Sequence, residues 1–155
     1  MSGVPAAPET VPHPEPPTVA FVCLHGAAKS VLAAACFERL AEARGVWVRA
    51  LAAGTEPDPE IAPAVLRALL AEGIDLRSER PRSVTPEDLA AAAAIVSFGP
   101  DLSRLAPPGR SIVRWDDVPA LSEDFEAGRA AILARLPLFS SSSAPRPVQW
   151  TGRWC

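Results

Sequence analysis

Residues 19–45, VAFVCLHGAAKSVLAAACFERLAEARG, decide the fold that we expect. The first five residues are apolar and rich in strand formers, which is typical of a buried strand in a parallel sheet. After a short loop, Ser30 can cap a helix that runs to about Arg44 and ends at Gly45. The buried stripe of this helix would consist of Leu32, Ala35, Cys36, Phe37 and Leu40. The stretch therefore predicts a strand, a loop and a helix.

The same alternation of short apolar runs and helical segments continues along the chain. Further strands are predicted at 46–52, 94–98 and 111–115, and further helices at 61–72, from Thr85 onward, and at 122–135. Alternation of this kind predicts an α/β fold with a single four-stranded parallel sheet flanked by helices.

Three segments differ in composition and define the expected domain organisation. Residues 1–17 form a proline-rich leader, which we interpret as disordered, and residues 18–136 form the α/β domain. Residues 137–155 form a tail rich in serine and proline, interpreted as mobile, whose two tryptophans could contact a protein partner.

Composition excludes several classes of protein. The chain has 155 residues, which suits one domain, and a formal net charge of −3, which argues against nucleic acid as a partner. No apolar run is long enough to span a membrane, and the leader lacks the features of a signal peptide, so a cytoplasmic location is expected. The cysteines Cys23, Cys36 and Cys155 match neither a zinc pattern nor a disulfide framework, and we expect no metal and no cofactor.

The chemistry is expected at the carboxyl end of the first strand, where Cys23 lies. The predicted oxyanion-binding loop comprises Leu24, His25, Gly26, Ala27, Ala28 and Lys29. Successive loop N–H groups, the helix N-terminus and the Lys29 charge favour a bound anion, and Ser30 can donate a hydrogen bond to the sulfur. Gly26 can adopt a left-handed conformation there without steric cost. The loop predicts an anion cradle with a nucleophilic thiolate at its floor.

The chain resembles the low-molecular-weight protein tyrosine phosphatases and the arsenate reductases that share their flavodoxin-like, three-layer fold. The family loop is a cysteine, five residues, an arginine and a serine, and FVCLHGAAKSVLAAACF at 21–37 is similar to it. Four further segments carry the likeness, AAGT at 52–55, AEGID at 71–75, SVTPED at 83–88 and WDDVP at 115–119.

The resemblance implies a role for each matching residue. Cys23 corresponds to the nucleophile, Lys29 stands at the site of the transition-state arginine, and Ser30 corresponds to the serine that stabilises the thiolate. The family's general acid is an aspartate in an Asp-Pro loop, which here reads Asp116-Asp117-Val118-Pro119, and either Asp117 or Asp116 could serve.

Three departures from the family pattern bear on activity. Lysine at position 29 cannot bind two oxygens in the bidentate manner of arginine, so turnover is expected to be weak. Ala28 replaces a second loop cysteine, and Ala120-Leu121 replaces an aromatic wall, which removes support for a phosphotyrosine preference. The predicted function is hydrolysis of a phosphomonoester through a phosphocysteine. The alternatives are an arsenate reductase that uses an external thiol and a non-catalytic phosphate-binding sensor or scaffold.

Overall fold

The computed structural model describes residues 16–141 of the chain, and its centre is a four-stranded parallel sheet. The strands are β1 (Thr18–Cys23), β2 (Arg49–Gly54), β3 (Ala94–Ser97) and β4 (Val113–Arg114). They lie in the order β2-β1-β3-β4, which places β1 in the interior of the sheet. This architecture confirms the predicted α/β class.

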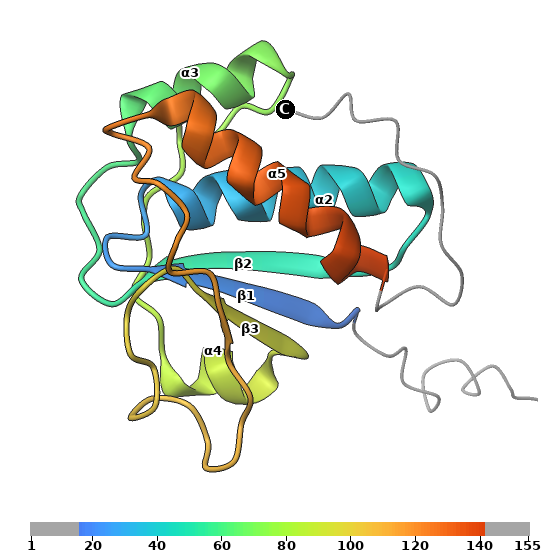
Figure 1. Cartoon of the computed structure of the whole chain (residues 1–155), viewed down its shortest axis with the longest axis vertical. Helices are drawn as coiled ribbons and strands as arrows, with labels where there is room; N and C mark the ends of the chain where they lie inside the picture. The colour runs from blue at the N-terminus through green and yellow to red at the C-terminus, as the bar shows by residue number, and fades with distance from the viewer. Residues whose placement is uncertain (1–15, 142–155) are drawn as a thin grey trace, which may run out of the picture.

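Helices cover both faces of the sheet. They are α2 (Lys29–Arg44), α3 (Pro63–Ala71), α4 (Pro86–Ala91) and α5 (Phe125–Ser141). Figure 1 shows α2 and α5 on one face, with α3 beyond them, and α4 on the opposite face. The loop between the end of β1 at Cys23 and the start of α2 at Lys29 connects the sheet to the helical layer.

Element boundaries differ from the sequence prediction most at three places. The predicted strand 46–52 begins only at Arg49, because Val46 N–H still bonds to Ala41 O in the cap that ends α2. The predicted strand 111–115 shortens to the two exposed residues of β4 at the sheet edge. The last helix begins at Phe125 and continues to Ser141, so the first five residues of the predicted tail are helical.

The core lies on both sides of β1. One cluster joins the sheet to α2 and α5, and its fully buried side chains include Phe21, Leu32, Phe37, Leu40 and Ile132. The other cluster lies on the α4 side and includes Ala20, Val22, Leu89, Ile95 and Leu102. Because alternate β1 side chains enter the two clusters, the strand is anchored from both faces and holds its carboxyl end in place.

Within residues 16–141, no helix is both long and apolar enough to cross a membrane. The leader through residue 15 and the tail from residue 142 lie outside the described residues, and with them the predicted tryptophan contact with a partner. The cytoplasmic location stays a prediction.

Candidate active site

Cys23 is the last residue of β1, and its side chain is almost completely buried. Its Sγ lies 3.1 Å from Ser30 Oγ and accepts a hydrogen bond from the Gly26 N–H at 3.2 Å. When the sulfur is ionised, the Ser30 hydroxyl can donate to it as well. Two donors on one sulfur stabilise the thiolate, the nucleophilic form of cysteine.

Ser30 was predicted to cap the helix, and this prediction is wrong. Helix α2 begins one residue earlier, at Lys29, and Ala28 occupies the cap position without a side-chain cap. Ser30 therefore lies inside the first turn with 0% exposure, where its hydroxyl reaches the sulfur. The role expected from the family resemblance, a serine beside the thiolate, matches this geometry.

The loop 24–29 is held by backbone hydrogen bonds from the segment that follows β2. Each bond has an N–H donor in the segment and a carbonyl acceptor at or next to the loop, at 2.7–3.2 Å. The N–H groups of Thr55, Glu56, Asp58 and Ala62 donate to the carbonyls of Cys23, Leu24, His25 and Ala27, in that order. Four carbonyl groups are thereby turned toward one side of the loop. Within the loop, the Gly26 N–H donates to the Cys23 sulfur.

Two glycines allow the loop to approach β2 closely. Gly26 has a φ of 61°, the left-handed conformation predicted from the sequence. A Cβ on Gly54 would lie 2.5 Å from Gly26 N and 2.7 Å from the carbonyl carbon of His25. Position 54 therefore requires glycine, because there is no space for a Cβ.

Cys23 opens into a cavity of about 480 Å³. All the predicted oxyanion-binding residues except Gly26 line it, and the other walls are Asp58, residues 62–65 at the start of α3, Phe98 and residues 120–122. Small apolar side chains such as Ala62, Ala64 and Ala120 dominate the outer walls. The cavity therefore has the Cys23 sulfur and the Lys29 ammonium on its wall, with space beyond them.

Lys29 supplies the cation of this cavity from the first residue of α2. Its Nζ donates to Val118 O at 3.3 Å and lies 5.9 Å from the centre of the Phe98 ring. A lysine ammonium has three donors, so two remain for an oxyanion. The contact with Val118 links the loop to the turn that carries Asp116 and Asp117.

The two candidate acids are not brought to the cavity. Asp116 Oδ2 accepts from Arg114 at 2.8 Å, and Asp117 Oδ2 accepts from Arg135 at 2.7 Å. The Asp117 side chain is 75% exposed, and neither aspartate lines the cavity. The Arg135 hydrogen bond lowers the pKa of Asp117 below its usual value, which is opposite to the shift that favours a general acid. Their acid role stays a prediction.

Sequence reasoning missed one charged residue that lines the cavity, Asp58. Its Oδ1 lies 3.3 Å from His25 Nδ1, which also contacts Glu56 O at 3.1 Å. Asp58 lies in a proline-rich link with no motif spacing to mark it, and only the pairing of this link with the loop brings it to His25. Among residues 16–141, no group of three or more His, Cys, Asp or Glu side chains could hold a metal ion.

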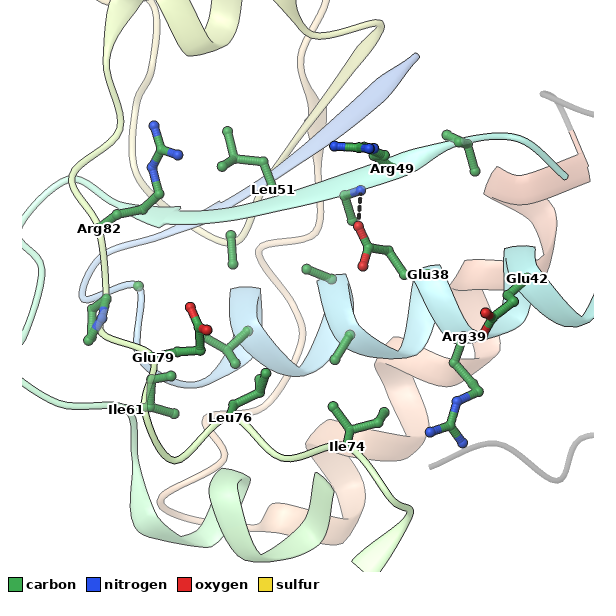
Figure 2. Close-up of a pocket in the computed structure, with 18 of the residues that line it drawn as sticks. Glu38, Arg39, Glu42, Arg49, Leu51, Ile61, Ile74, Leu76, Glu79 and Arg82 are labelled. Carbon is green, nitrogen blue, oxygen red and sulfur yellow. Dashed lines mark hydrogen bonds between the residues drawn. The ribbon is translucent and has the colours of Figure 1, made fainter. Parts of the chain in front are cut away.

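A second, larger cavity lies away from Cys23. Figure 2 shows this groove of about 880 Å³ between α2, the edge strand β2 and the segment 73–82. Apolar residues such as Ile61, Ile74 and Leu76 line it, and Glu38 Oε2 accepts a hydrogen bond from Ala50 N–H at 2.8 Å on its wall. No cysteine or histidine is among its lining residues, whereas Cys23 and His25 line the smaller cavity.

Residues 18–111 match the low molecular weight phosphotyrosine protein phosphatases. The chain belongs to this family. The match covers β1, the loop and α2, and therefore Cys23, Lys29 and Ser30, but it ends before Asp116 and Asp117.

Solved structures show the same fold. YfkJ from Bacillus subtilis is 23% identical, with a TM-score of 0.71 over 84% of this chain and 98% of that one. The thioredoxin-dependent arsenate reductase Cg_ArsC1' from Corynebacterium glutamicum is 26% identical, with a TM-score of 0.65 over 90% of this chain and 68% of that one. A low molecular weight protein tyrosine phosphatase from T. tengcongensis is 21% identical, with a TM-score of 0.66 over 81% and 95%. No curated protein matches the chain.

Proposed function

We propose that this phosphatase-family chain hydrolyses a phosphomonoester through a phosphocysteine at Cys23. One observation carries the proposal: a buried sulfur, within hydrogen-bond reach of Ser30 Oγ and the Gly26 N–H, forms the floor of a cavity that also contains a cation. A stabilised thiolate facing a site for a tetrahedral anion is the arrangement that covalent phosphoryl transfer needs.

The reaction has two steps. The sulfur attacks phosphorus, the S–P bond forms, and the P–O bond to the leaving group breaks as the leaving oxygen takes a proton. Water then attacks phosphorus, and the thiolate and inorganic phosphate are released. Lys29 and the loop amides hold the oxyanion in both steps. For Asp117 or Asp116 to donate the proton, the carboxylate has to leave its arginine and turn to the cavity.

Assays with an aryl phosphate test this proposal. Cys23→Ser is expected to abolish hydrolysis, because it removes the sulfur that lines the cavity. Equal rates for Cys23→Ser and the wild type would refute the proposal. Lys29→Arg is expected to raise the rate by about 10²- to 10³-fold, the range for restoring one preorganised donor.

The cavity walls bear on the substrate. Ala62, Ala64, Ala120 and Leu121 offer apolar contact without a ring, and Phe98 is the aromatic residue on the wall. A phosphotyrosine ring therefore finds little aromatic stacking, and we propose a phosphomonoester with a compact or aliphatic leaving group. A higher kcat/KM for phosphotyrosine peptides than for alkyl phosphates would contradict this choice.

Arsenate reduction is the second candidate, favoured by the 26% identity with an arsenate reductase over 90% of this chain. Arsenate is tetrahedral like phosphate, and its reduction to arsenite takes two electrons from two thiols, which become a disulfide. Residues 97–103 after β3 contain no cysteine, so the proposal requires an external thiol. Arsenite formed only when a low-molecular-weight thiol is supplied would support it. Phosphate binding without either turnover would support the sensor or scaffold alternative.

A further inference from the structure

The cavity around Cys23 brings together four titratable side chains. They are Cys23, Lys29, His25 and Asp58. The first two have roles in the proposed reaction, as nucleophile and as anion-binding cation. The reaction still needs a proton donor, and the two predicted donors, Asp116 and Asp117, are bound to arginines outside the cavity.

His25 and Asp58 form an oriented pair on the wall of this cavity. Nδ1 of His25 is 3.3 Å from Asp58 Oδ1 and 3.1 Å from Glu56 O. The backbone fixes this pairing, because Glu56 N–H donates to Leu24 O at 2.7 Å and Asp58 N–H donates to His25 O at 3.0 Å. Both side chains are about half exposed, 51% and 48%, as groups that exchange protons with substrate and water require.

The contacts at Nδ1 decide which ring nitrogen is available. With Nδ1–H directed at the Glu56 carbonyl and the Asp58 carboxylate, the proton that can be exchanged is carried by Nε2. A carboxylate that orients one imidazole nitrogen while the other moves the proton is the arrangement of a catalytic triad.

We propose that His25, oriented by Asp58, protonates the leaving group of the substrate. This inference rests on the proposed function and names a proton donor for it. In the first step the S–P bond forms, the electron pair of the breaking P–O bond stays on the leaving oxygen, and that oxygen takes the proton of Nε2. In the second step neutral His25 accepts a proton from the attacking water as the S–P bond breaks. His25 is then a catalytic residue and Asp58 a positioning residue.

Charged groups of both signs share the cavity with His25. Asp58 Oδ1 lies 3.3 Å from its ring, and Cys23 and Lys29 line the same cavity. Phosphoryl transfer to Cys23 replaces the thiolate by a phosphorylated sulfur, and its completion leaves the imidazole neutral and ready to accept a proton.

The kinetic test compares a poor with a good leaving group, an alkyl phosphate with an activated aryl phosphate. His25→Asn retains a donor near the position of Nδ1 but removes Nε2. It is expected to lower kcat/KM for the alkyl phosphate by about 10²- to 10⁴-fold, and for the aryl phosphate by at least tenfold less. Asp101→Asn, a matched aspartate change outside the cavity, leaves both rates unchanged. The proposal is overturned if His25→Asn slows both substrates equally, or if Asp117→Asn alone produces the unequal loss.

The pH profile tests the positioning role of Asp58. Hydrolysis of the alkyl phosphate by the wild type is expected to fall at alkaline pH, as the imidazolium loses its proton. Asp58→Asn moves this fall to lower pH, because a carboxylate that stabilised the imidazolium is gone, and Asp58→Glu restores it in part. An alkaline limb identical in the wild type and Asp58→Asn would contradict the pairing.

A measurement without turnover uses the ring-proton NMR signals of the two histidines. Inorganic phosphate is expected to shift the titration of the His25 ring to higher pH, since a nearby dianion favours the imidazolium, while His13 in the leader serves as an internal control. Equal responses of the two histidines would overturn the proposal. Failure of the proposed function would give a different result from failure of the His25 proposal. In that case Cys23→Ser would hydrolyse the aryl phosphate as fast as the wild type.

Discussion

Replacing Gly54 by alanine tests how the nucleophile's loop is held. The added Cβ would lie 2.5 Å from Gly26 N, 2.7 Å from His25 C and 2.8 Å from Leu24 O, which is about 0.6–0.9 Å inside the 3.4 Å of ordinary contact. All three atoms belong to the loop backbone, so no side chain can rotate away. The loop and β2 therefore have to separate by nearly an ångström.

Two consequences of Gly54→Ala can be given magnitudes. Overpacking of this kind lowers the free energy of unfolding by about 1–3 kcal/mol. A shift of nearly an ångström also disturbs the 3.2 Å contact between Gly26 N–H and Cys23 Sγ, and misplacement on that scale costs about 10²-fold in rate. Urea unfolding measures the first effect, and inorganic phosphate binding and aryl phosphate hydrolysis measure the second.

Gly45→Ala is the matched control. Gly45 has a φ of 71°, but nothing lies within 4 Å of an added Cβ, so alanine there adds backbone strain without a clash. It is expected to lower the free energy of unfolding by about 1–2 kcal/mol while leaving phosphate binding unchanged. The reasoning would be refuted by a Gly54→Ala protein that binds phosphate as tightly as the wild type, or by a Gly45→Ala protein that binds it equally weakly.

Three further predictions concern single contacts. Ser30→Ala removes the hydroxyl 3.1 Å from Cys23 Sγ and is expected to slow alkylation of that cysteine by iodoacetamide near neutral pH by about tenfold; an unchanged rate contradicts this role. Arg135→Ala is expected to raise the pKa of Asp117 toward its ordinary value, as read by NMR titration. Because this pKa is lowered in the folded protein, the stability that the pair contributes is present above the unfolded-state pKa and is lost as the pH falls through the folded-state pKa. The wild type and Arg135→Ala should therefore converge in urea midpoint at acidic pH, and a constant gap would argue against the pair. Thr85→Ala breaks the capping box of α4 and is expected to lower the free energy of unfolding by about 1 kcal/mol, with phosphate binding intact; an unchanged urea midpoint would show that the cap contributes nothing.

Local sequence was sufficient for the elements that carry their own signals. An apolar run marks β1, and a glycine in the left-handed conformation marks the end of α2. A threonine followed by a proline marks the start of α4. Boundaries were less certain where pairing partners decide them. β2 begins at Arg49, whose N–H donates to Pro17 O. α5 continues through Pro137 to Ser141, although a proline commonly marks the end of a helix.

The candidate site divides in the same way. Cys23, Lys29 and Ser30 lie within eight residues of one another, so their order along the chain predicts that they meet. The contacts of Asp117 with Arg135 and of Asp58 with His25 join residues 18 and 33 positions apart.

The sequence alone thus determined the class of fold and predicted which cysteine and which loop form the candidate site, because these depend on neighbours along the chain and on the periodicity of apolar residues. Only the tertiary structure decided that Gly54 must be glycine, that Asp117 faces Arg135, and that Asp58 reaches the cavity. Each of these depends on the distance and direction between segments that the chain brings together only by folding.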